Sequence, residues 1–437
     1  MNPRSSLETM IAVLWILLVI CLIWLMLTEL PAGWDGHLPL PYVIALSPFL
    51  WIPAVIFTVW GIVIQNWGFT LCAAAFLIAS TARGAAYIMN DLKAPNTAQA
   101  VADHIAKNKA RKALQQAALD ADLTATHNDS AAATAPSDAA AADATAVTAA
   151  TPTELGDTCR FMTLNCRFGR AQASHIVQAV RTRSIDVLAC QEMSDSFVAE
   201  LEAQGINELL PFHEFGHEHN NDNGGFNGIW SRVKPTMTMH SSCAIPAAEV
   251  PAMVLPVDEQ TTVTVASAHT KSPMRGCVQW SQGCIGLGEL VKGLPIQDES
   301  AQDEAALEQA ESIASAIEEV AETDADAKLA AVAEHIEESV STALPQNVVV
   351  VMGDLNSSIV HPSFRKLLSF GFHDAALSEA KGKHPTYPRW LRWPRIVLDH
   401  ILFTGHTQAT DVDSFTIAGT DHLALTATLH FHSKQAK

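Results

Sequence analysis

The stretch VVVVMGDLN at residues 348–356 carries the strongest signal for the fold of this chain. Four valines and a methionine in succession are typical of a β-strand that is covered on both faces, because β-branched side chains fit a pleated surface. Asp354 and Asn356 follow directly, so polar side chains are expected where the strand ends. A buried strand of this kind belongs to a layered domain and not to a helical bundle.

Short apolar runs of the same type recur on both sides of this stretch and alternate with helical patterns. Ala171–Thr182 has the spacing of an amphipathic helix, with Ile176, Val177 and Val180 on one side. Together these elements predict an α/β or α+β domain of packed layers at residues 158–437. The strand candidates are Arg160–Asn165, Asp186–Cys190, Asn227–Ser231, Val263–Ala268, Val348–Met352, Val397–Phe403 and Leu423–Phe431.

Charge and composition exclude some functions for the chain as a whole. The chain has 437 residues, of which 49% are hydrophobic and 17% charged, and its formal net charge is −19. This balance excludes a polyanion binder that uses the whole surface. However, 14 acidic residues and one lysine lie between Pro295 and Pro345, so the acidity is local. Nucleic acid or another phosphate ester therefore stays open as a ligand of the remainder.

Residues 1–92 are predicted to be a membrane region with about three transmembrane helices. Thr9–Thr28 has twenty uncharged, mostly apolar residues, enough to cross a bilayer at about 1.5 Å per residue. Leu38–Gln65 has no formal charge, and Trp67–Asn90 is interrupted only by Arg83. A cleaved signal peptide is the alternative for the first stretch, but two more apolar stretches follow it.

Two signals disagree about the side of the membrane that holds the globular domain. Basic residues after the last span favour the cytoplasm by the positive-inside rule. Six cysteines form an even set outside the membrane region, and Cys277 and Cys284 could pair in an oxidising compartment. Buried free thiols are the alternative. We expect a multi-pass protein of the cell membrane with an extracytoplasmic globular domain.

Two segments are predicted to lie outside the folded core. Residues 93–157 combine a stalk helix over Asn96–Leu123 with an Ala/Thr-rich linker, whose apolar surface is too small to offset the entropy of ordering. Residues 295–343 are expected to form an acidic, partly helical surface insertion between strands, since a run of charges is usually a solvated face.

Polar residues stand at the ends of the predicted strands, where active sites of layered sheet proteins are often built. They supply four carboxylates, two carboxamides and two imidazoles, at Asn165, Glu192, His269, Asp354, Asn356, Asp399, Asp421 and His422. Phosphate-ester hydrolysis needs such a set, because a hard cation takes carboxylate oxygens and a histidine held by an aspartate can activate water.

The motifs around these residues resemble the endonuclease/exonuclease/phosphatase superfamily, especially its deoxyribonuclease and sphingomyelinase branch. The matching stretches are TLN at 163–165, DVLACQE at 186–192, NGIWSR at 227–232, AHT at 268–270, GDLN at 353–356, LDHI at 398–401 and TDH at 420–422. The resemblance covers Cys159–Phe431 and implies a four-layer sandwich of two packed β-sheets with helices outside. It also implies a metal-dependent phosphodiesterase, most simply an endonuclease, which the apolar N-terminal stretches would tether to a membrane.

A divalent metal site follows from the same resemblance. Glu192 would be the main metal carboxylate, with Asn165 beside it and Asp421 nearby. The ion would be Mg²⁺, with Mn²⁺ as the alternative, because carboxylate oxygens are the ligands that these ions prefer.

Catalytic roles are implied by position as well. Asp354 and Asn356 would position the nucleophilic water and the phosphoryl group. His422 would be the general base or a phosphate contact, oriented by Asp399. His269 would be the general acid, and since the abasic-site branch usually has tyrosine at this place, abasic-site repair is not expected.

The residues expected to contact the substrate are Asn227, Arg389 and Trp390. Arginines alternate with aromatic residues from Tyr387 to Arg395, a pattern that suits a nucleic-acid backbone with bases to stack on. It suits a phospholipid headgroup at the bilayer equally well. The alternatives are therefore a lipid or sugar phosphate phosphatase, a sphingomyelinase-like hydrolase, or a non-catalytic binding module.

Other histidines receive structural interpretations. His400 follows Asp399 in a strand and so points to the opposite face, away from the site. Several asparagines lie close to four further histidines, His213, His217, His219 and His240. We expect these histidines to form a polar loop, with a second metal site as the alternative.

Overall fold

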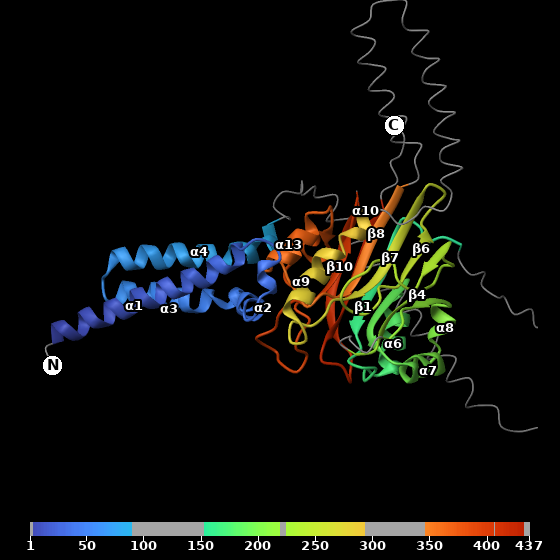
Figure 1. The fold of residues 1–437 in the computed structure, drawn as a ribbon, viewed down its shortest axis with the longest axis horizontal. Helices are drawn as coiled ribbons and strands as arrows, with labels where there is room; N and C mark the ends of the chain where they lie inside the picture. Colours follow the sequence, from blue (N-terminus) through green and yellow to red (C-terminus); the bar gives the residue numbers. More distant parts are fainter. Residues whose placement is uncertain (1–2, 90–152, 219–223, 293–345, 406, 432–437) are drawn as a thin grey trace, which may run out of the picture. The chain divides into compact units, whose positions relative to one another are not determined.

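The computed structural model describes residues 3–89, 153–218, 224–292, 346–405 and 407–431. The acidic insertion predicted near 295–343 and the predicted stalk and linker up to residue 152 lie outside the described residues. From residue 153 onward, two six-stranded sheets carry helices on their outer faces (Figure 1). This architecture confirms the predicted fold class.

Each sheet has one parallel pair of strands at its centre and antiparallel strands on both sides. The first sheet has the order β11-β12-β1-β2-β4-β3, with β1 and β2 parallel. Its strands are β1 (Thr158–Asn165), β2 (Val187–Met193), β3 (Phe212–Phe215), β4 (Phe226–Ser231), β11 (Thr407–Thr416) and β12 (Leu423–Phe431).

The second sheet repeats this plan, in the order β5-β6-β7-β8-β10-β9, with β7 and β8 parallel. Its strands are β5 (Met237–Met239), β6 (Ala252–Pro256), β7 (Thr261–His269), β8 (Gln346–Asp354), β9 (His373–Asp374) and β10 (Asp399–Phe403).

The valine run on β8 is buried on both faces, as its composition predicts. Val348, Val350 and Met352 belong to the core between the two sheets. Val349 and Val351 belong to a second core, between this sheet and the helices that cover it. The alternation follows from the two-residue period of a strand, and it explains why the run contains no polar residue.

Helices cover the outer face of each sheet. Ile176 on one helix and Phe197 on another are buried against the first sheet together with Met162 and Leu164 of β1. Phe364 and Leu367 pack in the same way on the second sheet. The helices are α6 (Ala173–Arg183), α7 (Asp195–Ala203), α8 (Ile206–Leu209), α9 (Cys277–Gly286), α10 (Glu289–Lys292), α13 (Pro362–Leu368) and α14 (Ala375–Glu379).

The N-terminal region is helical and apolar. Two stretches, Leu7–Glu29 and Trp67–Ile88, are long and apolar enough to cross a membrane. The span expected at Leu38–Gln65 is instead a pair of helices bent by 52°, so the expected count of three is reached only if this pair forms one span. The helices are α1 (Pro3–Met26), α2 (Leu40–Ala45), α3 (Trp51–Val63) and α4 (Trp67–Met89), and the 3-10 turns are η1 (Leu27–Glu29), η2 (Trp34–Gly36) and η3 (Ser47–Phe49).

Buried hydrogen bonds join this region to the sandwich, and both belong to one compact unit. Asp35 is fully buried, and its carboxylate accepts hydrogen bonds from the backbone N–H and the hydroxyl of Ser363 at the start of α13. A ring nitrogen of His361 lies 3.1 Å from the carbonyl oxygen of Pro41. A buried carboxylate needs such partners, so the attachment is specific.

All eight cysteines are free thiols. Cys277 and Cys284 lie on the same helix, α9, seven residues apart. At 1.5 Å per residue their Cα atoms are roughly 10 Å apart, which is beyond the reach of a disulfide. The pairing considered from the sequence is therefore wrong, because the short segment between the two cysteines is helical.

Candidate active site

Strand pairing brings the predicted catalytic residues to one edge of the two sheets. Asp354 ends β8, and in the strand register it stands opposite His269 on β7 and Asp399 on β10. In the other sheet, Asn165 ends β1 beside Gln191 on β2. Because the two central parallel pairs end at the same edge, residues almost 200 positions apart meet there.

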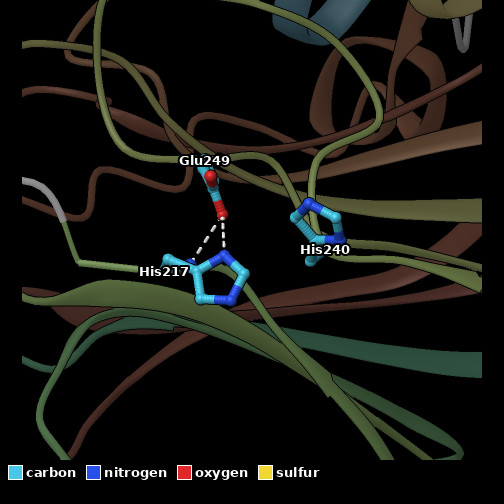
Figure 2. Close-up of side chains that lie close together, drawn as sticks. All are labelled: His217, His240 and Glu249. Atoms are coloured by element: carbon cyan, nitrogen blue, oxygen red, sulfur yellow. Dashed lines mark hydrogen bonds and ion pairs between the residues drawn. The ribbon is translucent and has the colours of Figure 1, made fainter.

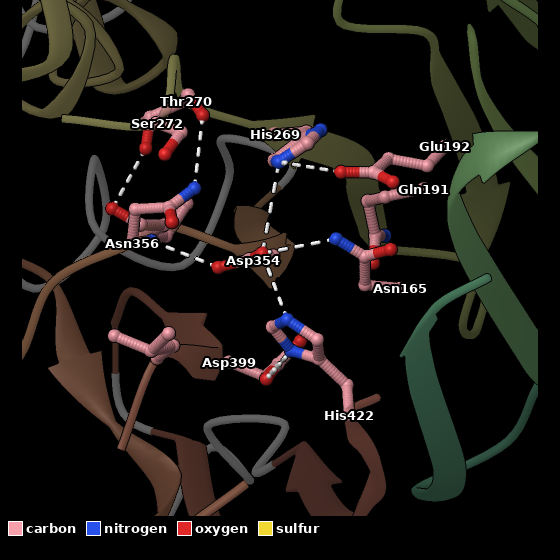
Figure 3. A network of polar contacts seen from close by, with 12 residues as sticks. Asn165, Gln191, Glu192, His269, Thr270, Ser272, Asp354, Asn356, Asp399 and His422 are labelled. Carbon is pink, nitrogen blue, oxygen red and sulfur yellow. Dashed lines mark hydrogen bonds and ion pairs between the residues drawn. The ribbon is translucent and has the colours of Figure 1, made fainter. Parts of the chain in front are cut away.

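Asp354 is the centre of the cluster (Figure 3). The Oδ2 atom of Asp354 accepts a hydrogen bond of 3.0 Å from the side-chain amide of Asn165. The same oxygen lies 3.6 Å from Nε2 of His269 and 3.6 Å from Nε2 of His422. The Oδ1 atom accepts the backbone N–H of Asn356 at 2.9 Å. One buried carboxylate therefore organises both histidines.

His422 is held by a second carboxylate. Its Nδ1 atom lies 2.8 Å from Oδ2 of Asp399, and both residues are buried. Burial opposes the positive charge of His422, but Asp399 and Asp354 outweigh it and raise the pKa of His422 to about 10. The other oxygen of Asp399, Oδ1, has no hydrogen-bond partner among the described residues.

Glu192 and His269 form the opposite wall of the cluster. Glu192 has a positive φ of 52° at an irregularity in β2, which turns its carboxylate toward the site. Its Oε1 atom lies 3.8 Å from Nε2 of His269. Burial raises the pKa of Glu192, and burial lowers the pKa of His269. His269 is therefore biased toward the neutral form, unlike His422.

Asp421 lies at the rim of the cluster and is partly exposed. Its Oδ2 atom is 3.6 Å from Nε of Arg167. It is near enough to Glu192 for its negative charge to raise the pKa of that group further. Asp421 therefore lies close to Glu192, at the rim of the cluster.

Asn356 is fixed by backbone geometry as well as by its side chain. It adopts a left-handed conformation with φ of 48°, which asparagine tolerates better than most residues. Its side-chain amide donates to the carbonyl oxygen of Thr270 at 3.1 Å. His400, interpreted from the sequence as structural, is buried and contacts Asp374 and the carbonyl oxygen of Ser357.

The three predicted substrate residues are in different surroundings. Arg389 donates its backbone N–H to the carbonyl oxygen of Asp421 and its side chain to that of Thr420, at the edge of the cluster. Trp390 is 61% exposed, and its ring lies 5.8 Å from that of Tyr387. Asn227 is buried and donates to the carbonyl oxygen of Glu249, and its Oδ1 atom has no hydrogen-bond partner among the described residues.

Several supporting residues were not predicted. The side-chain amide of Gln191 donates to Ser267, which links the two sheets beneath the site. The hydroxyl of Thr420 donates to the carbonyl oxygen of Asn165, and Tyr387 lies 5.0 Å from the ring of His422. Gln191 and Thr420 are sequence neighbours of the predicted residues Glu192 and Asp421. This proximity is the signal by which the sequence could have indicated them.

A second cluster lies apart from the active site (Figure 2). His217, His240 and Glu249 bring one ligand atom each within 4.8 Å of one another. Nδ1 of His217 lies 2.8 Å from Oε2 of Glu249. His213 is not part of it and stacks on Phe215, and His219 is outside the described residues. The expected polar loop thus contains a partial ligand set, two of whose members are exposed.

The residues of the active-site cluster fit a divalent cation. Glu192 is partly buried and Asp354 is buried, and burial is the largest effect that raises the pKa of each carboxylate. Asp354, Asp399 and His422 also bring ligand atoms within 4.8 Å of one another. Asp399 and His422 already bond each other. The oxygens of Asp354, Glu192 and Asn165 therefore suit an ion better than the group of Asp354, Asp399 and His422 does.

Two packed sheets with carboxylate, amide and imidazole side chains clustered at one edge are typical of phosphate-ester hydrolases. Residues 162–422 match the Endonuclease/Exonuclease/phosphatase family, and the chain belongs to that family. This confirms the resemblance in the motifs, as well as the coarse expectation of a hydrolase acting on phosphate esters.

Solved structures similar to this chain share little sequence with it. A humanized TDP2 from D. rerio is 12% identical, with a TM-score of 0.38, and the match covers 63% of this chain and 100% of that one. A truncated TDP2 from Caenorhabditis elegans is 13% identical, with a TM-score of 0.40 and coverage of 62% and 97%. A family protein from Leptotrichia buccalis is 13% identical, with a TM-score of 0.37 and coverage of 62% and 100%. No curated protein matches the chain.

Proposed function

We propose that this protein is a divalent-metal-dependent phosphodiesterase held at a membrane by its N-terminal helices, and that its substrate is a nucleic-acid-like phosphodiester. The observation that carries the proposal is the convergence of Asn165, His269 and His422 on a single oxygen of Asp354. A site built only for structure would not need two histidines of opposite protonation bias on one buried carboxylate.

Glu192, Asn165 and Asp354 would hold the ion, which would be Mg²⁺ or Mn²⁺, with Asp421 close by. When bound, this ion supplies charge stabilisation for the phosphoryl oxygens and lowers the pKa of water. Carboxylate and amide oxygens are hard ligands, so these residues favour Mg²⁺ or Mn²⁺ over a soft metal that prefers thiolates.

His422 and Asp399 would act on the attacking water. Asp399 orients the imidazole through Nδ1, which leaves Nε2 facing Asp354 and the substrate side. With a pKa of about 10 the imidazole carries a proton at neutral pH, so it can accept one only when other cations balance the two carboxylates. This requirement supports metal dependence.

His269 would protonate the leaving oxygen, and Asn356 would hold a phosphoryl oxygen. The Nε2 atom of His269 lies between Glu192 and Asp354, 3.8 Å and 3.6 Å from their nearest oxygens. Burial is the largest effect on the pKa of His269 and lowers it, whereas the charge of Asp354 opposes this shift. Since burial favours the neutral form of His269, this role requires that the negatively charged phosphodiester raise the pKa of His269 when it binds.

The rim of the site supports a substrate that presents a planar group beside a phosphate. Arg389 lies at the edge of the cluster, and Tyr387 and the exposed Trp390 stand next to it. Stacking on such residues tolerates any base, because each base has a π-face. A phospholipid headgroup is the second candidate, since the apolar helices would bring the site close to a bilayer.

The helices support an integral membrane protein. The expectation of an extracytoplasmic domain depended on a cysteine pair, and that pair cannot form on α9. The last apolar stretch contains Arg83 near its end, and it is followed by Lys93 and Lys107. We therefore favour the cytoplasmic face for the catalytic domain by the positive-inside rule.

The full chain in detergent micelles tests the function. With Mg²⁺ it should cleave bis(p-nitrophenyl) phosphate, a diester, faster than p-nitrophenyl phosphate, a monoester, and it should nick plasmid DNA. EDTA or Asp354→Asn should lower the rate by about 10²-fold or more. The control is Asp413→Asn, which changes an exposed aspartate paired with Arg183. Faster release of a phosphorylated headgroup from a phospholipid, or of inorganic phosphate from a lipid phosphate monoester, would select the second candidate, and full activity in Asp354→Asn would overturn both.

A further inference from the structure

A cavity of about 640 Å³ lies where the N-terminal helices meet the sandwich. Its walls come from α1, α3, α4 and η3 on one side, and from residues 358–360 and 383–397 on the other. Its size falls within the range of roughly 300–1,000 Å³ that is typical of small-molecule sites. No residue of the described catalytic cluster lines it, so it is a separate site.

The lining of this cavity has two chemical characters. Most of it is apolar, with Leu25, Phe49, Trp51, Ile88, Val360 and Ile396 among the contributors. Three cations complete it, Arg83, Lys383 and Arg395, and no aspartate or glutamate lines it. An apolar chamber bordered by positive charge is complementary to an anionic amphiphile.

Lys383 is the cation best placed to receive an anion. Arg83 pairs with Glu29, and Arg395 donates to the carbonyl oxygens of Pro388 and Arg389. Lys383 has no hydrogen bond or ion pair with any described residue.

Lys383 is an exposed residue whose ammonium packs beside α4. Its Nζ atom lies against Gly84 of α4 and 5.9 Å from the centre of the Tyr87 ring. This packing lowers the pKa of Lys383. An ammonium that lines the cavity and has no carboxylate partner among the described residues is available to pair with an anion.

We propose that this cavity binds one acyl chain of an anionic phospholipid, whose phosphate pairs with Lys383. The helices that form one wall are the two stretches apolar enough to span a bilayer, so a lipid chain can reach the cavity from the membrane without crossing water. Tryptophans at the wall, Trp51 and Trp393, suit the interfacial depth at which a phosphate group lies.

The cavity is connected to the catalytic cluster through the chain itself. Ser358 follows Asn356 by two positions, and Val397 precedes Asp399 by two. Both walls therefore lead directly into segments that carry catalytic residues. The lipid site does not depend on the proposed hydrolase activity, since its occupancy is measured without turnover.

Photolabelling of the full chain in nanodiscs tests the site. The probe is phosphatidylglycerol with a diazirine near the middle of one acyl chain, and the labelled peptides are mapped by mass spectrometry. Label should concentrate on the peptides of α4 and of residues 383–397. Ala79→Trp fills the cavity from α4, and Lys383→Met removes the anion partner, so each should reduce this labelling by about tenfold.

Two matched controls separate the cavity from the general lipid surface. Ile78→Trp places the same indole at the adjacent position of α4, where the side chain is 72% exposed and does not line the cavity. Lys381→Met removes a nearby lysine that pairs with Glu379. Both controls should label like the unmodified chain, and thermal unfolding of all four variants should show that each is folded.

Several outcomes would overturn the proposal. Equal labelling of Ala79→Trp and Ile78→Trp would mean that the probe reports only the outer helix surface. Equal labelling by the same probe with a phosphatidylcholine headgroup, unchanged in Lys383→Met, would remove the role of the anion. Cross-links from Ala79→Cys to residues 91–150 would show that the chain's own linker fills the cavity. Native mass spectrometry of the full chain should, in support, retain one phospholipid that Ala79→Trp lacks.

Discussion

Nδ1 of His422 lies 2.8 Å from Oδ2 of Asp399, in a buried pair that joins β10 to the start of β12. Two different sheets contribute the partners, so the pair exists only when the sandwich is assembled. Its buried carboxylate fixes which ring nitrogen faces the substrate side. Orientation of this kind is what a general base requires.

Asp399→Asn should lower kcat by about 10²–10⁴-fold and change KM little, because it removes the anion that orients His422 without touching the substrate. The pH–rate profile of the variant should also shift to lower pH, since Asp399 contributes to the raised pKa of His422. Steady-state kinetics with bis(p-nitrophenyl) phosphate checks both effects. A variant with an unchanged profile would refute the positioning role.

Mg²⁺ should stabilise the chain against unfolding, and Glu192→Gln should abolish most of this effect. At about 100 times its Kd, an ion that binds only the folded state adds about 2.7 kcal/mol. Thermal unfolding with and without Mg²⁺ measures the shift. The control is Glu202→Gln, an exposed glutamate on α7. Equal shifts in the two variants would exclude Glu192 as a metal ligand.

Substitutions of Asn356 can separate the role of its side-chain amide from the role of its backbone conformation. Asn356→Gly keeps the left-handed backbone at φ of 48° and loses the hydrogen bond to Thr270, so activity should fall while stability changes little. Asn356→Ala should lose activity equally and also cost about 1–2 kcal/mol of stability. Parallel assays of rate and unfolding decide this. An active glycine variant would show that the amide is dispensable.

Gly353 should tolerate no side chain. It has φ of +149°, and a Cβ atom there would lie 1.8 Å from the carbonyl oxygen of Ala268 on the paired strand. Gly353→Ala should therefore destabilise the domain by about 3 kcal/mol or more, because β7 and β8 must separate. Gly371→Ala is the control, with φ of +104° but open space around it, and should cost roughly 1–2 kcal/mol. Similar unfolding temperatures would contradict the argument.

The buried pair of His400 and Asp374 predicts a pH-dependent stability. Burial opposes the charge on His400, but the 2.6 Å contact with Asp374 outweighs it and raises its pKa. The stabilisation is fully present below the unfolded pKa of about 6.5 and is lost as pH rises through the folded value. Asp374→Asn keeps an oxygen to cap α14 and removes the charge.

We expect Asp374→Asn to cost about 1–3 kcal/mol near pH 6 and less at alkaline pH. Unfolding curves at several pH values compare the variant with the unmodified chain. A difference that grows with pH would contradict the assigned direction of the pKa.

The strand at Val348–Met352 could be predicted because both of its faces are buried. This run contains no polar residue, so burial is visible in composition alone. Five strands were missed, namely β3, β5, β6, β9 and β11. The edge strands β3, β5 and β9 have few residues, and β11 is an edge strand with many exposed or half-exposed side chains. Such strands are defined by their neighbours and not by their own periodicity.

The amino-acid sequence by itself determined the layered class, the apolar N-terminal helices and the residue types at the strand ends. It also determined the family, through short motifs in a fixed order. Only the tertiary structure decided that Asp354 is the common partner of both histidines, that Asn227 bonds elsewhere, and that Cys277 and Cys284 cannot pair. The physical reason is that composition reports burial along the chain, whereas contacts between strands depend on register and on how two sheets meet.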